Sequence, residues 1–341
     1  MSGRKNRRVV LAARPSGLPK LSDFRVEETP MPRPAEGEVL LKVQYLSLDP
    51  YMRGRMNDAK SYAKPTAIGQ EMEGGTVATV LESRHPEYRA GENVLSYSGW
   101  QSHAIAKPSE LRKLDPKDAP LTTALGVLGM PGFTAYAGLL TIGRPKAGET
   151  VVVAAATGPV GSAVGQIAKI KSARAIGIAG GKAKCDFARQ ELGFDAVLDH
   201  GAADFPEQLA KVCPNGIDVY FENVGGHVWD AVFPLLNDFS RIPVCGLIAQ
   251  YNVDGDFPGP DRFPVVMRQV LSKRLHIQGF IQRDFAEQRP AFYKDMAQWI
   301  REGRVKYRED IIDGLENAPQ GLIGLLQGKN FGKLIVRLAE E

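Results

Sequence analysis

The sequence is poor in cysteine and has little excess charge, and each shortage excludes a class of protein. Its three cysteines, at positions 185, 213 and 245, form no CxxC pair. A disulfide framework is therefore excluded, and a reducing compartment such as the cytoplasm is indicated. Lys and Arg number 43 against 39 Asp and Glu, which leaves a net charge of +4 over 341 residues. That surplus is too small to indicate a nucleic acid or an anionic membrane as a partner.

Long apolar runs and metal-ligand clusters are missing as well. The apolar stretch that follows the basic start ends at Arg14 and Pro15, too early for the apolar region of a secretory signal. No run approaches the roughly 18 apolar residues of a membrane span. The five histidines are scattered, and with the cysteines they do not give the ligand sets of a structural or a catalytic zinc. We therefore expect a cytoplasmic protein without a leader, a membrane span or a bound metal.

The pattern of the chain changes near residue 128. Before it, short alternating segments are broken by glycine and proline, as in FRVEETPMPRPAEGEVLLKVQYLSLDP, which indicates a mostly β module. After it, apolar strands such as TVVVAAA and ARAIGIA alternate with helical segments. This alternation is typical of a parallel, doubly wound α/β sheet. The last residues predict one helix and one strand that return to the first module.

The most specific motif is the turn after the strand at residues 151–155. It reads Ala156-Thr157-Gly158-Pro159-Val160-Gly161 and leads into a helix. This is the G-x-G-x-x-G turn of dinucleotide sites with alanine in its first position. Gly158 lets the backbone approach a pyrophosphate, and Gly161 lets the helix pack closely on the strand. The pyrophosphate would bind at the helix N-terminus. A merely tight strand–helix turn is the alternative.

The end of the next strand indicates which dinucleotide binds. An NAD site needs an acidic residue there to hold the ribose 2′-hydroxyl, but Gly180 and Gly181 stand in its place, followed by Lys182 and Lys184. A missing carboxylate and added ammonium groups suit a 2′-phosphate. The sequence therefore favours NADPH over NADH, with solvated lysines on a first helical turn as the alternative.

Several segments together resemble a known family. They are SLDPYMRGRM, GVLGMPGFTAY, AAATGPVGSAVGQIAK, ENVGG, PVCGL and KNFGKLIVR, and the likeness runs through essentially the whole chain. The chain is similar to the zinc-independent medium-chain dehydrogenase/reductases, in the prostaglandin/leukotriene reductase branch that also holds plant alkenal reductases and curcumin reductases. IGQEMEGG fits this reading, because Gln70 stands where the zinc enzymes have a histidine ligand.

The resemblance implies an architecture and an activity. It implies a GroES-like β domain at residues 1–127 and 315–341, and a Rossmann NADPH-binding domain at 128–314. It also implies NADPH-dependent reduction of a carbon–carbon double bond conjugated to a carbonyl, in enones and alkenals that include curcumin-like compounds, usually by a homodimer. A zinc-independent NADPH quinone reductase and a non-catalytic NADPH-binding protein are the alternatives.

The resemblance also implies cofactor contacts, residue by residue. Lys184 matches the lysine that holds the 2′-phosphate, and His200 stands in the slot where many relatives have a tyrosine that approaches it. His200 as a plain polar strand-end residue is the alternative. The full set of expected cofactor contacts is Thr157, Gly158, Pro159, Val160, Gly161, Gly180, Lys184, His200, Asn223, Cys245, Gly246, Tyr251, Phe280 and Asn330, the last two near the nicotinamide.

Reduction of an enone needs a group that stabilises the developing enolate and delivers a proton, and a phenol suits both tasks. Tyr251, just beyond the strand expected beside the nicotinamide, is the first candidate, with a capping aromatic as its alternative role. Tyr51 and Tyr62 are the other tyrosines that the resemblance places in the pocket. Water or a cofactor ribose hydroxyl stays open as the source of the final proton.

A flat conjugated substrate needs an apolar, aromatic pocket. Trp100, Met130 and Phe280 are candidate walls. Each of the three has an ordinary core position as its alternative.

Overall fold

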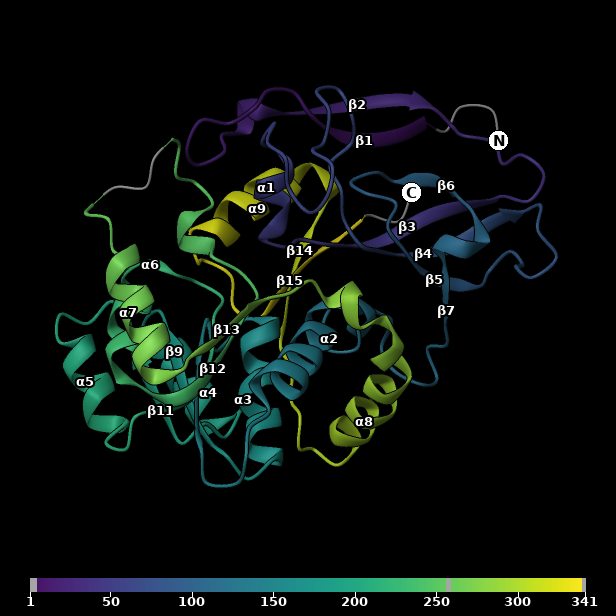
Figure 1. Cartoon of the computed structure of the whole chain (residues 1–341). Coiled ribbons are helices and arrows are strands. Elements are labelled where there is room, and N and C mark those ends of the chain that lie inside the picture. Colours follow the sequence, from purple (N-terminus) through teal and green to yellow (C-terminus); the bar gives the residue numbers. More distant parts are fainter. Residues whose placement is uncertain (1–4, 256–258, 339–341) are drawn as a thin grey trace. The chain divides into compact units, whose positions relative to one another are not determined.

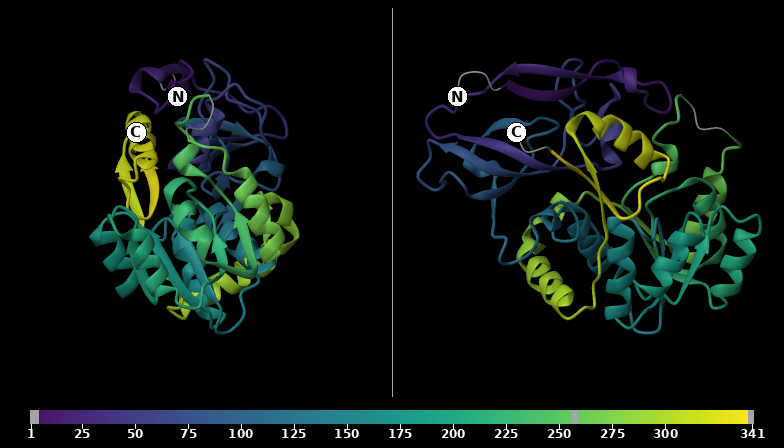
Figure 2. Two further views of the ribbon diagram at one scale, coloured as in Figure 1. Left: turned by 60° about the vertical axis from the view of Figure 1, so that its left-hand side comes forward. Right: turned by 180° about the vertical axis from the view of Figure 1, so that it is seen from behind.

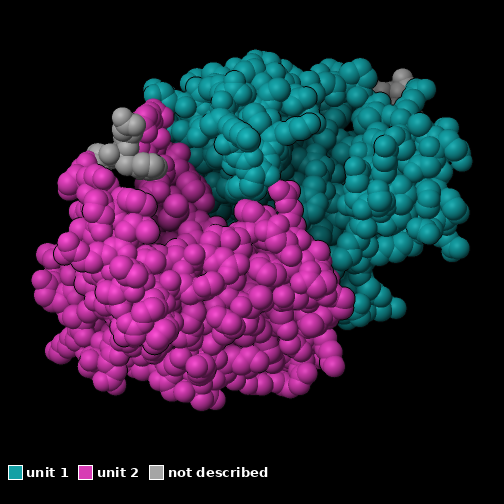
Figure 3. Space-filling view, viewed as in Figure 1, with its two compact units in different colours: residues 1–126, 309–341 teal, residues 127–308 magenta. Residues whose placement is uncertain are grey.

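The computed structural model describes residues 5–255 and 259–338. The chain divides into two compact units, coloured separately in Figure 3. Residues 1–126 and 309–341 form one, called here the β unit, and residues 127–308 form the other, the α/β unit.

The second boundary lies earlier than the sequence indicates. Strand β14 (Glu309–Asp313) pairs in parallel with β15 (Lys333–Arg337), which in turn pairs with β3 (Val39–Ser47). Figure 2 shows the two C-terminal strands in yellow beside helix α9 (Ala318–Leu326). The prediction that residues 309–314 belong to the nucleotide-binding domain is therefore wrong, because β14 completes the edge of the β unit's sheet.

The β unit is built on the long strand β3, which pairs with strands distant in the sequence. In the described residues its main sheet has the order β14-β15-β3-β4-β5-β7, with β6 also paired to β3. Val39, Leu41 and Val43 alternate along β3 and are buried in one core with Trp100. The other strands are β1 (Lys5–Leu11), β2 (Phe24–Pro30), β4 (Thr76–Ser83), β5 (Asn93–Ser96), β6 (His103–Ala106) and β7 (Arg112–Leu114), and a short helix α1 spans Tyr51–Arg55.

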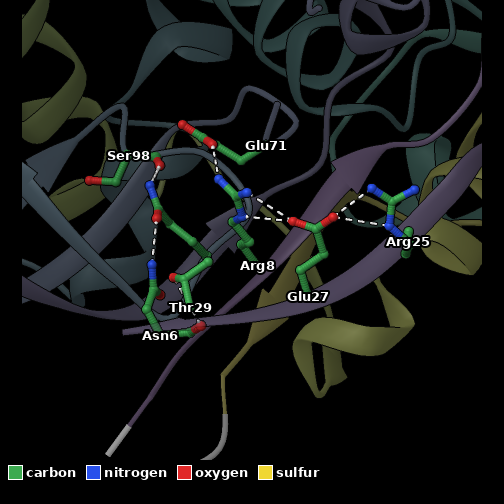
Figure 4. Close-up of polar contacts among 8 residues, drawn as sticks. Asn6, Arg8, Arg25, Glu27, Thr29, Glu71 and Ser98 are labelled. Atoms are coloured by element: carbon green, nitrogen blue, oxygen red, sulfur yellow. Dashed lines mark hydrogen bonds and ion pairs between the residues drawn. The ribbon is translucent and has the colours of Figure 1, made fainter. Parts of the chain in front are cut away.

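The β1–β2 ribbon is fastened to the rest of the β unit by polar side chains (Figure 4). The Arg8 guanidinium donates to Glu27 at 2.8 Å and to Glu71 at 3.4 Å. Asn6 Nδ2 donates to Gln101 at 2.9 Å, whose own amide donates to the Ser98 carbonyl at 2.7 Å. These bonds join the ribbon to the segments before β4 and after β5.

The α/β unit contains the expected parallel sheet (Figure 1). Its strands are β8 (Thr150–Ala154), β9 (Arg174–Ala179), β10 (Ala196–Asp199), β11 (Ile217–Phe221), β12 (Leu236–Val244) and β13 (His276–Gly279). In the described part of the chain they lie in the order β10-β9-β8-β11-β12-β13. The chain therefore reverses its winding between β8 and β11, and a crevice for ligands forms at such a point beyond the carboxyl ends of the strands.

Helices cover both faces of this sheet. Successive residues of β8 point to opposite sides, and both sides are buried. Val151 and Val153 pack in one cluster, and Val152 and Ala154 in another. The helices are α2 (Met130–Ala137), α3 (Pro159–Ile170), α4 (Lys182–Gln190), α5 (Phe205–Val212), α6 (Gly226–Val232), α7 (Phe263–Lys273) and α8 (Arg289–Arg301). The predicted fold class, a doubly wound parallel sheet inserted into a mostly β module, is confirmed.

Two helical glycines differ in the space around them, which gives a test of packing. A Cβ on Gly165 of α3 would lie 1.9 Å from Phe194 Cζ, whereas one on Gly324 of α9 would meet nothing closer than 3.8 Å. Gly165→Ala should lower the free energy of unfolding by about 1–3 kcal/mol through overpacking. Gly324→Ala should raise it by up to about 1 kcal/mol through helix propensity. Urea unfolding of both variants measures this, and equal stabilities would mean that Phe194 moves without strain.

Candidate functional site

The turn between β8 and α3 has the tight geometry that its glycines suggest. Gly158 caps α3, and its N–H donates to the Ala155 carbonyl at 2.9 Å. A Cβ on Gly161 would lie 2.2 Å from that same oxygen, so the helix packs directly on the strand end. Pro159 begins the helix, where its missing N–H is not needed. The first N–H groups of α3, including that of Val160, are therefore available to an anion beyond the carboxyl end of β8. Thr157 is itself buried.

At the end of β9 the structure separates the two predicted lysines. Lys182 forms an ion pair with Asp186 on its own helix. Lys184 instead lies close enough to His200 for its charge to lower the pKa of the imidazole. His200 is held by its backbone N–H, which donates to the Ala179 carbonyl at 3.0 Å. Its Nε2 lies 3.1 Å from where a Cβ on Gly180 would be, so the ring faces the end of β9.

His227 also belongs to this cluster, and the sequence analysis missed it. Its Nε2 lies 3.2 Å from His200 Nδ1. The sequence position of His227 could have indicated its place, because each of the two histidines follows the carboxyl end of a parallel strand. His200 follows β10, and His227 lies in the first turn of α6, after β11.

Glu222, directly after β11, organises the centre of the carboxyl edge. Its side chain is 1% exposed. Oε1 accepts hydrogen bonds from the N–H groups of Val224 and Gly225, at 2.7 and 2.9 Å, and from the Tyr220 hydroxyl at 3.0 Å. Oε2 is buried without a partner among the described residues. Burial raises the pKa of the carboxyl, and the hydrogen bonds oppose that rise.

The backbone around Glu222 joins three strand ends. Its carbonyl accepts the N–H groups of Cys245 and Gly246, at 2.9 and 3.2 Å, from the segment that follows β12. The neighbouring Asn223 side chain donates to the Ala154 carbonyl at the end of β8, at 2.9 Å. Asn223 therefore holds β8 and β11 together at the point where the winding of the sheet reverses.

Tyr251 folds back over the turn that follows β12. Its hydroxyl oxygen accepts a hydrogen bond from the Leu247 N–H at 3.3 Å. The same oxygen lies 3.1 Å from where a Cβ on Gly246 would be, so glycine at that position makes room for the phenol. A hydroxyl that accepts a hydrogen bond is polarised toward donating its own proton.

The three cysteines carry no reactive thiolate. Burial beside Glu222 raises the pKa of the Cys245 thiol to about 12. Burial raises the pKa of Cys213 to about 11 and also raises that of Cys185. All three thiols are therefore protonated at neutral pH.

In the β unit, the rings of Tyr51 and Tyr62 both lie close to the guanidinium of one arginine. The Arg55 guanidinium lies 5.5 Å from the Tyr51 ring centroid and 4.5 Å from that of Tyr62. Arg55 Nε also donates to Glu73 at 3.1 Å. Burial and the charges of Asp49 and Glu73 raise the pKa of Tyr51 well above its usual value. Tyr62 is 50% exposed.

A buried ion pair that the sequence did not indicate holds the segment before Tyr51. Lys333 Nζ donates to the Leu48 carbonyl at 2.7 Å and to Asp49 Oδ1 at 2.8 Å. The Ser47 hydroxyl donates to the other carboxylate oxygen. Lys333 and Asp49 are only 2% and 4% exposed. This network fixes the turn from β3 into α1, the helix that Tyr51 begins.

Other predicted residues lie in local structure or in the core. The Asn330 side chain donates to the Gly332 carbonyl of its own loop, at 2.8 Å. The prediction of Trp100 as a pocket wall is wrong, because its ring is fully buried and stacks on Phe24 with centroids 5.8 Å apart. The Phe280 ring packs in the core against Phe221, which leaves its 8% exposed surface as the part open to a ligand. Met130 is partly exposed at the start of α2.

The described part of the chain has neither a metal-binding cluster nor a membrane-spanning helix. Residues 5–255 and 259–338 contain no group of three His, Cys, Asp or Glu side chains that could hold a metal ion. Within the same residues, no helix has the length and apolarity to cross a bilayer.

Comparisons with known proteins match the chain along its length. Residues 7–114 match a family model described as the N-terminal domain of oxidoreductase, and residues 159–302 match one described as zinc-binding dehydrogenase. The chain is 58% identical to the NADPH-dependent curcumin reductase of Escherichia coli, over 98% of this chain and 97% of that protein. It is 40% identical to a tobacco 2-alkenal reductase (NADP(+)-dependent), over 98% of each chain. A crystal structure of CurA from Vibrio vulnificus in complex with NADPH superposes with a TM-score of 0.96 at 57% identity, covering 98% of this chain and all of the other.

Glu222 gives a prediction for the dependence of stability on pH. Its pKa in the folded state is above the unfolded value of 4.5, so the folded state binds more protons between the two values. The free energy of unfolding therefore falls as pH rises from about 4.5 through the folded pKa. Glu222→Gln should remove this fall, which amounts to at most about 1.4 kcal/mol per pH unit for one proton. Urea unfolding of both proteins between pH 4 and 8 tests it, and parallel curves would contradict it.

Proposed function

Because the chain belongs to the medium-chain dehydrogenase/reductase family, we propose that it reduces carbon–carbon double bonds conjugated to a carbonyl, with NADPH as the reductant. The observation that carries the proposal is the 58% identity to a curcumin reductase over 98% of the chain. Such continuous similarity spans both units of the chain. The substrate class is therefore enones and alkenals, curcumin-like compounds among them.

The carboxyl edge of the α/β unit suits NADPH. Thr157, Gly158, Pro159, Val160 and Gly161 would hold the pyrophosphate at the start of α3, where a Cβ on Gly161 would be only 2.2 Å from a backbone oxygen.

At the end of β9 the 2′-phosphate would meet Gly180, Lys184 and His200. Lys184 is the better placed cation for this task, because its charge already acts on His200 at the end of β9. Asn223, Cys245, Gly246, Phe280 and Asn330 remain proposed contacts along the rest of the cofactor.

The bound cofactor would supply the hydride that reaches the β-carbon of the substrate. Tyr251 would donate a hydrogen bond to the carbonyl oxygen and so stabilise the enolate as its charge develops. The Leu247 N–H holds the phenol oxygen at 3.3 Å and limits its movement. Tyr251 would also deliver the proton that completes the reaction at the α-carbon.

Tyr51 is less suited to give up a proton. Burial and two nearby carboxylates raise its pKa well above the ordinary range. It suits a hydrogen-bond donor or an aromatic wall, and Arg55 fixes its ring. Tyr62, half exposed beside Arg55, would pack against a flat substrate.

We also propose a homodimer, in which a second copy of this chain covers an apolar surface beside the edge strand β13. β13 is the last strand of its sheet, and an edge strand offers unpaired backbone groups. The apolar side chains exposed beside it are Phe263, Val265, Met267, Leu271 and Ile277. The Leu271 side chain is 80% exposed in the single chain. Sedimentation should therefore give a dimer for the natural chain and a monomer for Leu271→Glu.

We further propose a cytoplasmic location, which the unpaired thiols fit.

The decisive experiment follows NADPH oxidation at 340 nm with curcumin, simple alkenals and a quinone, together with product analysis. The proposal expects loss of NADPH that depends on the enone and a saturated carbonyl product. Activity with the quinone alone would replace it with a quinone reductase. Tight NADPH binding without turnover would indicate a non-catalytic protein.

Lys184 and Lys182 form a matched pair for cofactor choice. Lys184→Ala should raise the KM for NADPH about tenfold or more through loss of a charge-assisted contact, and leave the KM for NADH nearly unchanged. Lys182→Ala should change neither, because its ammonium is paired within its own helix. Equal changes for both cofactors in Lys184→Ala would mean that this lysine does not bind the 2′-phosphate.

Tyr251→Phe should lower kcat about a hundredfold and leave NADPH affinity nearly unchanged, since it removes a hydrogen bond used in the reaction. Tyr51→Phe is the matched control and should lower kcat much less. Steady-state kinetics with one enone measures both. Unchanged turnover in Tyr251→Phe would assign the proton to Tyr51, Tyr62 or water.

A further inference from the structure

Two histidines, His200 and His227, form a coupled pair at the carboxyl edge of the α/β unit. His200 Nδ1 and His227 Nε2 are 3.2 Å apart, and the ring centroids are 5.2 Å apart. The rings of His227 and Phe205 form a T-shaped pair, with centroids 6.4 Å apart and ring planes at 74°. His200 thus has one ring nitrogen against His227 and the other facing the end of β9, beside Gly180.

The N···N contact limits the protonation states of the pair. A hydrogen bond between the two nitrogens needs one hydrogen, so one imidazole donates and the other accepts. When His200 carries protons on both nitrogens, Nδ1–H donates to a neutral His227. The Nε2–H of His200 then points to the end of β9. An acceptor at position 227 is therefore what orients a doubly protonated His200 toward that end.

Burial and the charges around His200 disfavour its protonated form when no anion is present. Burial, His227 and Lys184 lower its pKa, and Asp199 opposes them. The Asp199 carboxylate is partly satisfied, because it accepts backbone hydrogen bonds from Gly181 and Gly201. A dianion placed between Lys184 and His200 would reverse this balance by favouring the imidazolium.

We propose that the His200–His227 pair takes up one proton when the 2′-phosphate of NADPH binds, and that His227 is the positioning residue which makes His200 a donor to that phosphate. This rests on the proposed use of NADPH. The proton comes from solvent and goes to His200, no covalent bond changes, and the product is an imidazolium–phosphate ion pair. NADH has no 2′-phosphate and binds without this proton.

The inference predicts a pH dependence specific to one cofactor. NADPH affinity should rise as pH falls from 8 toward 6.5, because protonation of His200 is coupled to binding. The rise should end near pH 6, where the phosphate itself takes up a proton. NADH affinity should lack this rise.

Calorimetry of the full chain with NADP⁺ and NAD⁺ tests the inference. Titrations at pH 7 in buffers of different ionisation enthalpy give the protons taken up on binding. We expect about half a proton or more for NADP⁺ and close to none for NAD⁺. His200→Gln should abolish the uptake.

Two variants of His227 separate positioning from simple packing. His227→Phe removes the acceptor and should weaken NADP⁺ binding about tenfold with loss of proton uptake. His227→Gln keeps an acceptor and should retain most of the affinity. NAD⁺ binding should be the same in both variants and the natural chain, which also shows that they fold.

Equal proton uptake for the two cofactors, or unchanged NADP⁺ affinity in His227→Phe, would overturn the inference. Enone reduction by a chain that takes up no proton with NADP⁺ would overturn it and leave the proposed function intact. Proton uptake with NADP⁺ in a chain that reduces no enone would support it and refute the proposed reaction. Failure to bind NADP⁺ would overturn both.

Discussion

The acceptance of three hydrogen bonds by one buried carboxyl oxygen is the constraint on which the carboxyl edge of the α/β unit depends. Glu222 Oε1 closes the turn after β11, and the carbonyl of the same residue holds the start of the segment after β12. Burying a carboxyl group is unfavourable unless its oxygens are satisfied. Here the bonds to one oxygen offset part of that penalty, and the backbone bonds of Glu222 fix the start of the segment that leads to Tyr251.

The two sets of tyrosines show how environment divides similar side chains between tasks. Tyr51 lies beside carboxylates and against Arg55, in surroundings that keep its proton in place. Tyr251 lies on a turn where a backbone N–H already donates to its oxygen. These surroundings support the proposed roles, in which Tyr51 keeps its proton and Tyr251 donates one. Sequence motifs alone do not separate these roles, because the charges that distinguish them come from other elements.

Local and periodic features were predictable from the sequence, and long-range pairs were not. The β8–α3 turn follows from a buried strand, two glycines and a helix in succession, and the sheet follows from apolar strands alternating with helices. Lys333 reads as a surface residue, yet it pairs with Asp49, 284 positions away, inside the β unit. β14 was assigned to the wrong domain because its partner β15 comes later in the chain. His227 was missed because only the folded chain brings α6 beside the end of β10.

The protonation of the three thiols matters for an enzyme with the proposed substrates, because it affects how fast the cysteines would react with them. Enones and alkenals are electrophiles that alkylate thiolates. Cys245 lies at the carboxyl edge of the α/β unit, directly after β12. Burial raises the pKa of all three thiols, so each is protonated at neutral pH, the form that reacts slowly with such electrophiles. The burial that packs these side chains therefore also favours the form of each thiol that is least reactive toward the proposed substrates.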